Sequence, residues 1–187
     1  ILISLKLVEK IHGDNATIGY KKSLFSLPAV VDKALAKRED IKKLAAILAK
    51  ENTIVITADG ISYSLAKEAA LKIKETSYKN ISAAILGEFM HGHVAVLNNP
   101  SMLIYIAVDE ISKRSVSNLN KIKEDYKPKL VIIGPAGEEV KPDCNINIVS
   151  ENEIQQMFAN VVICQQLALA TALKEMLTIR EGFIKLL

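Results

Sequence analysis

From residue 53 onward, the sequence alternates short apolar runs with segments of helical periodicity, and this alternation restricts the fold to one class. The runs are rich in β-branched residues, as buried strands are, and they lie at 53–58, 81–86, 102–108, 129–135 and 146–149. Helices are predicted between them at 62–77 and 112–126, and a long apolar helix is predicted at 153–177. Strands that are apolar along their whole length are covered on both faces, which is typical of parallel sheets. The sequence therefore predicts an α/β fold with a doubly wound parallel sheet of four or five strands.

The N-terminal segment is predicted to be a helix without a partner of its own. Residues 1–13 carry apolar side chains at helical spacing, and the pattern stops at Gly13, a common signal at helix C-termini. We expect residues 1–20 to be a helical arm, or the end of a preceding domain, that packs on a partner, and residues 21–187 to form the domain itself. The chain begins with Ile1 and not with Met, which indicates a segment of a longer or processed protein.

Two further helices are predicted before the first strand. Residues 14–22 are polar and are interpreted as a connector. The helix predicted at 26–37 has Ser26 as its N-cap and Pro28 in its first turn, and a second amphipathic helix is predicted at 38–51.

Composition excludes several classes of function. The net charge is only +3, the basic residues are scattered among acidic ones, and Trp is absent, so nucleic-acid binding has little support. Cys144 and Cys164 have neither disulfide nor metal-ligand spacing, and Cys164 lies in an apolar helical run typical of a core residue. No signal peptide or uncharged apolar stretch of membrane-spanning length is visible. These features predict a protein of the reducing cytoplasm that does not enter a membrane.

Ligands of open parallel sheets bind where strands end and helices begin. The first such place is the turn after residues 53–58, where Gly60 and Ser62 open a helix and can offer backbone N–H groups to a phosphate. A strand-to-helix turn needs a glycine and a cap in any case, and Asp59 would repel an anion. The turn is therefore a candidate binding site with an equally simple structural interpretation.

The second place carries less common residues, in the stretch GEFMHGHVAV at 87–96. Glu88, His91 and His93 lie within it, and the glycines at 87 and 92 permit unusual backbone angles or close approach to a ligand. These three side chains could form a metal site, but the H-x-H spacing is short and a further histidine ligand is lacking nearby. No metal is predicted.

A pair of charged residues completes the candidates. Lys72 and Glu75 lie three apart in the predicted helix at 62–77, so they share a face and can form an ion pair. Such a pair is most often a solvated surface feature.

Read together, these segments resemble a known family. EAALKIKETSY followed by AAILGEFMHGHVAVL resembles the second sugar isomerase (SIS) domain of glucosamine-6-phosphate synthase, with its A-L-K-x-K-E-x-S-Y and G-E-x-x-H-G-P segments. The resemblance extends over nearly the whole chain and implies a SIS-type, flavodoxin-like three-layer fold. In that family fructose 6-phosphate binds between two SIS domains and across a dimer, and a Ser/Thr loop of the first SIS domain holds the phosphate.

The resemblance also implies roles for individual residues. Glu75 matches the glutamate that moves a proton between the first and second sugar carbons, and Lys72 matches a lysine beside the substrate. His91 matches the histidine that opens the sugar ring and reaches into a neighbouring subunit's site. Glu88 matches a glutamate of the family's loop, and the role expected for it is structural, in support of the residues that contact the substrate. These residue types suit the reaction, because a ketose–aldose conversion needs one base for two carbons and histidine exchanges protons near pH 7.

The sequence departs from the family pattern in places. Met90 replaces a lysine, His93 replaces a proline, and the turn before Ser62 lacks a glycine of the family's G-R-G. The family ends in a tail whose lysine forms a Schiff base with the ketone. Here only Arg180 and Lys185 echo that tail, so Lys185 is the candidate for the Schiff base.

The resemblance implies an isomerase or aminotransferase domain acting on fructose 6-phosphate or glucosamine 6-phosphate. Two alternatives remain open, namely a deaminase or deglycase of amino-sugar or fructosamine phosphates, and a non-catalytic sugar-phosphate-binding SIS domain. Glu75 together with His91 favours a catalyst, because binding alone needs no proton carrier. The expected partners are a sugar phosphate and a second SIS domain or second copy in a dimer. No cofactor is expected.

Overall fold

The computed structural model describes residues 2–97 and 100–186, with side chains described through residue 178. The five strands of this part of the chain form one parallel sheet in the order β2-β1-β3-β4-β5. They are β1 (Thr53–Ala58), β2 (Ile81–Ile85), β3 (Ser101–Ile106), β4 (Lys129–Ile133) and β5 (Cys144–Ile146). The predicted α/β fold with a doubly wound parallel sheet is confirmed.

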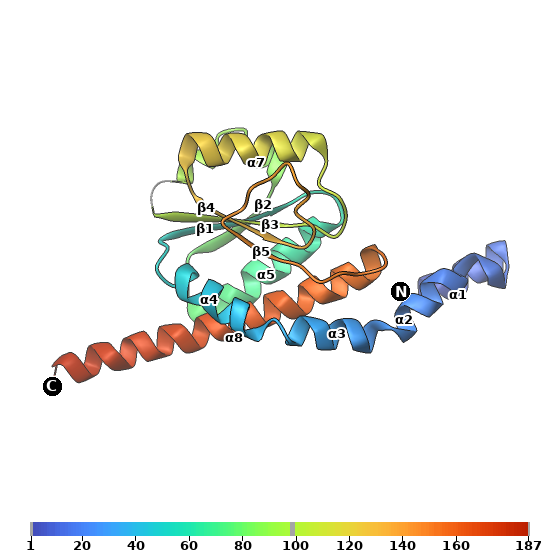
Figure 1. Cartoon of the computed structure of the whole chain (residues 1–187), viewed down its shortest axis with the longest axis horizontal. Coiled ribbons are helices and arrows are strands. Elements are labelled where there is room, and N and C mark those ends of the chain that lie inside the picture. Colours follow the sequence, from blue (N-terminus) through green and yellow to red (C-terminus); the bar gives the residue numbers. More distant parts are fainter. Residues whose placement is uncertain (1, 98–99, 187) are drawn as a thin grey trace.

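Helices cover both faces of this sheet (Figure 1). The crossover from β1 to β2 is α5 (Ser62–Ser77), which lies with α4 (Arg38–Leu48) and α8 (Glu153–Leu186) on one face. The crossover from β3 to β4 is α7 (Lys113–Tyr126), on the opposite face. Because β2 and β3 lie on opposite sides of β1, the winding reverses between β1 and β3. The carboxyl ends of these two strands are therefore the topological switch point, where doubly wound sheets bind ligands.

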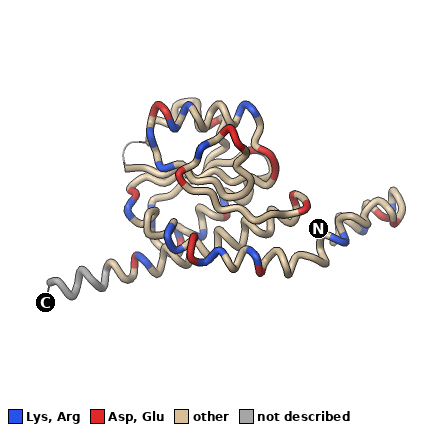
Figure 2. The backbone as a smooth tube through the Cα atoms, in the orientation of Figure 1, with Lys and Arg blue, Asp and Glu red and all other residues tan. Residues whose placement is uncertain are grey.

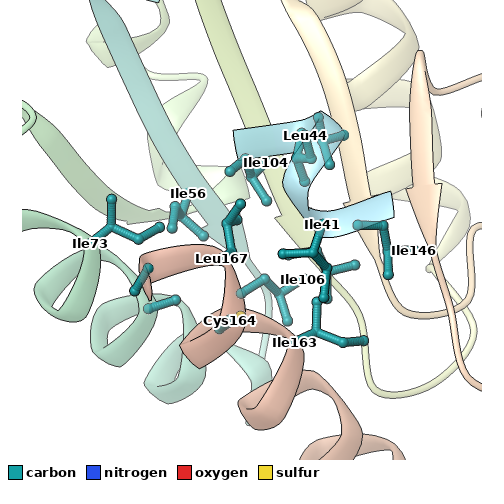
Figure 3. Packing of buried hydrophobic residues seen from close by; sticks show 14 of the residues in the cluster. Ile41, Leu44, Ile56, Ile73, Ile104, Ile106, Ile146, Ile163, Cys164 and Leu167 are labelled. Carbon is teal, nitrogen blue, oxygen red and sulfur yellow. The ribbon is translucent and has the colours of Figure 1, made fainter. Parts of the chain in front are cut away.

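Each strand contributes to two cores, because successive side chains point to opposite faces. Ile56 and Ile104 pack with α4, α5 and α8, whereas Val55 and Leu103 pack toward α7. Figure 3 shows the first of these cores, in which α8 inserts Cys164 between the sheet and the neighbouring helices. Cys164 is buried in this core, which confirms its predicted role, and the burial raises the pKa of its thiol to about 12.

The last helix is longer than predicted. Its segment Glu153–Thr178 is long and apolar enough to cross a membrane, with a mean hydropathy of 1.3. The same helix packs along α3, α4 and α5, and its buried residues include Ile163, Cys164 and Leu167. A helix at the core of a globular domain is apolar for the same reason. Packing in the core accounts for the apolar residues on the inner face of α8.

The predicted connector at 14–22 is wrong, because these residues are helical. The structure has α1 (Leu2–His12), a 3₁₀ turn at Asp14–Thr17, α2 (Ile18–Phe25) and α3 (Leu27–Leu35). Residues 18–25 lack a clear apolar stripe, which is why their pattern resembles a loop. Their helix is supported instead by a polar contact, since Asn152 at the start of α8 donates a hydrogen bond to the hydroxyl of Ser23. The assignment of residues 1–20 to a preceding domain stays a prediction.

The arm formed by α1 and α2 projects away from the sheet (Figure 1). Glu9 is buried within it and accepts hydrogen bonds from Lys21, Thr17 and Lys6, the last at 3.1 Å. The bond from Lys21, followed by those from Thr17 and Lys6, lowers the pKa of Glu9 to about 2. These contacts fix α1 against the turn that follows it, so the arm has a defined shape.

Two local details differ from the prediction. Ser26 occupies the N-cap position of α3, as predicted, but its side chain makes no capping hydrogen bond, and its hydroxyl donates instead to the Ser23 carbonyl oxygen at 3.1 Å. Pro28 does lie in the first turn of α3, as predicted. The last strand begins at Cys144, two residues before the predicted run, because the Asp143 N–H bonds to the Leu130 carbonyl oxygen at 2.8 Å and sets the pairing with β4.

Candidate active-site surface and switch-point cavity

The charged cluster predicted on one helix face forms on α5. Lys72 Nζ donates to Glu75 Oε2 at 3.0 Å and lies 3.7 Å from Glu68 Oε1, one turn earlier. The side chains of Lys72, Glu75 and Glu68 are 42%, 50% and 55% exposed. The hydrogen bond to Glu75, and then the charges of Glu75 and Glu68, raise the pKa of Lys72, which is therefore cationic at neutral pH. The cluster presents one lysine between two carboxylates.

This cluster lies on an open surface, away from the carboxyl edge of the sheet. Glu75 follows Ser62 by thirteen residues, so it lies about 20 Å along the α5 axis from the start of the helix. The opposite side of α5, which includes Ala69 and Ile73, is buried in the core. A substrate that reaches Glu75 would therefore be enclosed by another surface and not by the interior of this chain.

The stretch GEFMHGH does not form a simple loop. It folds as α6 (Leu86–Phe89) followed by a 3₁₀ turn at His93–Val96, and the buried Phe89 anchors it to the core below α7. Gly92 has φ +105°, a backbone angle that other residues rarely adopt, so this glycine is needed to turn the chain here. Glu88, His91 and His93 are exposed. Among the described residues, no group of three His, Cys, Asp or Glu side chains lies close enough to hold a metal ion.

The turn between β1 and α5, which was the first candidate binding site in the sequence, lies at the topological switch point. Gly60 and Ser62 line a cavity of about 220 Å³ between the N-termini of α5 and α7. Asp59 also lines it, and its Oδ2 accepts hydrogen bonds from the Tyr105 hydroxyl at 3.1 Å and the Ser115 hydroxyl at 2.7 Å. Burial, and then the charge of Asp59, raise the pKa of Tyr105, so its hydroxyl stays neutral and acts as a donor.

Comparison with known proteins identifies the family. The model of the SIS domain family matches residues 47–176, which is more than half of the chain. The chain belongs to the SIS domain family. The family predicted from the sequence is thereby confirmed.

Relatives of this SIS domain include sugar-phosphate enzymes. It is 27% identical over 150 residues to glutamine–fructose-6-phosphate aminotransferase (isomerizing) of Clostridium acetobutylicum, covering 80% of this chain and 24% of that protein. It resembles the C-terminal domain of glucosamine-fructose-6-phosphate aminotransferase from Francisella tularensis with a TM-score of 0.76 and 23% identity, covering 84% of this chain and 45% of that one. It also resembles glucosamine-6-phosphate deaminase from Thermotoga maritima with a TM-score of 0.60 and 18% identity, covering 90% and 48%. The SIS domain thus spans about a quarter of the first relative and about half of each solved structure.

The structure brings the predicted site residues of this SIS domain together only in part. Lys72 and Glu75 are in contact, and the His91 N–H donates to the Glu88 carbonyl oxygen at 3.0 Å. Among the described side chains, no hydrogen bond or ion pair joins His91 to the cluster on α5. Lys185 lies beyond the residues whose side chains are described.

Sequence reasoning missed two groups of residues in this SIS domain. Glu68 is four residues before Lys72, a spacing that places it on the same helix face and could have revealed it. The network of Asp59, Tyr105 and Ser115 joins residues 46 and 56 positions apart, which only the strand order brings together. No local pattern in the sequence indicates that network.

Proposed function

We propose that this SIS domain supplies the proton-transfer surface of a sugar-phosphate isomerase or aminotransferase that acts on fructose 6-phosphate or glucosamine 6-phosphate. The observation that carries the proposal is the Lys72–Glu75 pair at 3.0 Å on the open face of α5. Membership of the SIS family and the names of the relatives support the substrate class. The reaction takes place in the cytoplasm, where Cys144 and Cys164 remain free thiols.

Glu75 acts as the base in this proposal. It removes a proton from one of the first two sugar carbons and returns it to the other, which converts a ketose into an aldose. The Lys72 ammonium group lies 3.0 Å from this carboxylate on the same helix face. The same lysine can attract the developing negative charge on the neighbouring sugar oxygens. A rigid helix holds both groups, as a catalytic pair requires.

His91, Glu88 and Lys185 complete the proposed site. His91 opens the sugar ring, because an imidazole can both give and take a proton near neutral pH. Its exposed position, and the absence of a bond to the α5 cluster among the described side chains, suit a role in the site of a neighbouring copy. Glu88 positions the segment, and Lys185 forms the Schiff base when the ketone is aminated. The phosphate is held by a loop of another SIS domain.

The uptake of solvent deuterium tests this function. Fructose 6-phosphate is incubated in D₂O with the 187-residue chain, alone and with a SIS domain that carries a Ser/Thr phosphate loop, and carbon-bound deuterium is followed by NMR. We expect deuterium at the first two carbons only when both domains are present, and only weak binding by the chain alone. Sugar-phosphate binding without exchange would indicate a sensor. Release of ammonia from glucosamine 6-phosphate, without exchange into fructose 6-phosphate, would indicate a deaminase.

We also propose that the domain works as a dimer or with a second SIS domain. Exposed apolar side chains are concentrated on α1, at Leu2, Ile3 and Leu7, and on α8, at Leu173 and Met176. Monomeric proteins rarely expose apolar patches of such extent. Sedimentation at micromolar concentration should give a dimer, and replacing Leu173 and Met176 with glutamate should shift it to monomer. Sedimentation of the unchanged chain as monomer only would contradict this part of the proposal.

A further inference from the structure

The chain leaves α5 through a residue in an uncommon backbone conformation. Tyr78 caps the C-terminus of α5 with φ 57° and ψ 13°, in the left-handed region, and its N–H donates to the Lys74 carbonyl oxygen at 3.0 Å. Glycine is the usual residue at this position, because the Cβ of any other residue comes too close to a carbonyl oxygen. A bulky residue in this conformation is an outlier, and such outliers persist where the surrounding structure holds them.

The residues on both sides of Tyr78 hold it in this conformation. Ser77 is buried, and its hydroxyl bonds to a carbonyl oxygen of α5 at 2.6 Å. Lys79 Nζ donates to the Ala49 carbonyl oxygen at the end of α4 and lies 3.1 Å from Glu175 Oε1 on α8. The turn is therefore fixed to two neighbouring helices by contacts that do not involve the side chain of Tyr78.

The aromatic ring of Tyr78 contributes little to the fold, because this residue is 91% exposed. Lys127 caps α7 in the same conformation, with φ 52°, and is exposed as well. A lysine has a structural reason to lie there, since a positive charge is favourable at a helix C-terminus. A neutral aromatic residue lacks that reason. The ring of Tyr78 is therefore placed for a contact outside this chain.

Tyr78 lies beside the proposed proton-transfer surface. It follows Glu75 by three residues, which is about 5 Å along the α5 axis. Within α5 and its C-cap, all of which the structure describes, the exposed large apolar residues are Leu71 and Tyr78. Leu71 precedes Glu75 by four residues and shares its helix face, and Tyr78 ends that face. The proposed base thus lies between two exposed apolar side chains.

Charge alone does not orient a sugar on this surface. Basic and acidic residues occur together along the helices below the sheet (Figure 2), and Lys72 lies between Glu68 and Glu75. The carbon skeleton of a sugar carries C–H groups, which charged side chains do not bind. A tyrosine offers these groups the apolar face of its ring and offers the sugar hydroxyls a polar tip.

From this arrangement we propose that Tyr78 is a substrate-binding residue whose ring packs on the carbon skeleton of the sugar phosphate at Glu75. The inference rests on the proposed function and adds a residue to its site. The left-handed backbone conformation keeps the ring on the open surface, where a substrate meets it. Packing on the sugar skeleton is present both before and during proton transfer, so it strengthens substrate binding without accelerating the chemical step.

The kinetics of deuterium exchange test the inference in the assembled enzyme, which is this chain together with a SIS domain that carries a Ser/Thr phosphate loop. Tyr78→Gly should raise the KM for fructose 6-phosphate about tenfold and leave kcat nearly unchanged, because the lost contact is made equally in the ground state and the transition state. Tyr78→Phe should keep KM within about twofold, because it retains the ring. Lys127→Gly makes the same backbone change at the end of α7 and should leave both constants unchanged.

Thermal unfolding separates this role from a structural one. Tyr78→Gly relieves a left-handed residue, so it should raise the melting temperature of the 187-residue chain by about 2–4 °C while it weakens substrate binding. Lys127→Gly should raise the melting temperature less, because it also loses a favourable charge at a helix C-terminus. A lower melting temperature for Tyr78→Gly would make Tyr78 a structural residue and overturn the inference. An unchanged KM in Tyr78→Gly would also overturn it and leave the proposed function standing, whereas an unchanged enzyme without any exchange would overturn both.

Discussion

Replacing Gly134 with alanine should destabilise the domain by about 3–5 kcal/mol, among the largest effects of a single substitution. Gly134 follows β4 and has φ +109°, and a Cβ built on it would lie 1.9 Å from the carbonyl oxygen of Ala107. That oxygen belongs to the backbone just after β3 and cannot move aside. It also accepts a hydrogen bond from Asn160 Nδ2 at 2.7 Å, which links the end of the sheet to α8. A methyl group would break this connection.

Gly137 provides a control for the backbone angle alone. It has φ +70°, but a Cβ there would meet no heavy atom within 4 Å. Gly137→Ala should therefore cost only about 1–2 kcal/mol, the usual price of a left-handed conformation. Urea unfolding followed by circular dichroism compares the two variants. If Gly134→Ala is no less stable than Gly137→Ala, the close approach to Ala107 does not constrain the fold.

The sheet could be predicted from sequence because its strands are buried on both faces. Residues 53–58 form a continuous apolar run, and the predicted boundaries of this strand and of the helix at 62–77 agree with the structure. In these segments, local propensity, apolar periodicity and tertiary burial all favour the same conformation. The prediction fails at residues 14–22, because residues 18–25 form a helix without a clear apolar stripe. This helix contacts a distant part of the chain through Ser23, which accepts a hydrogen bond from Asn152, 129 residues further on.

The candidate site also has one part that local sequence predicts and one part that it does not. The Lys72–Glu75 contact follows from helical spacing alone, so the sequence was sufficient to predict it. The sequence predicts that Gly60 and Ser62 lie at the switch-point turn. It does not predict the cavity, because the lining also includes Tyr105 and Ser115. These residues reach Asp59 only because β3 lies next to β1, and the order of strands is not encoded in any short pattern.

Replacing Glu75 with glutamine should lower turnover by about 10²- to 10⁴-fold in the assembled enzyme, the range expected for loss of a general base. The amide is isosteric with the carboxylate and can still bond to neighbouring groups, so substrate binding should remain nearly unchanged. A loss that falls on kcat and not on KM indicates an interaction made only in the transition state. In free-energy terms, the expected loss is about 3–5 kcal/mol of transition-state stabilisation.

A matched ion pair on another helix supplies the control. Glu39 and Lys42 are also three residues apart, at 2.7 Å, and both are exposed on α4. Exposed pairs contribute about 0–1 kcal/mol to stability, so Glu39→Gln and Glu75→Gln should have similar melting temperatures. A difference in turnover between these variants then reports chemistry and not folding.

The most direct measurement is the rate of deuterium incorporation into fructose 6-phosphate by the assembled enzyme with Glu75, with Glu75→Gln and with Glu39→Gln. The proposal predicts that exchange falls at least a hundredfold in Glu75→Gln at saturating substrate and stays unchanged in Glu39→Gln. Equal exchange rates in all three proteins would contradict it and would leave the Lys72–Glu75 pair as a solvated surface contact.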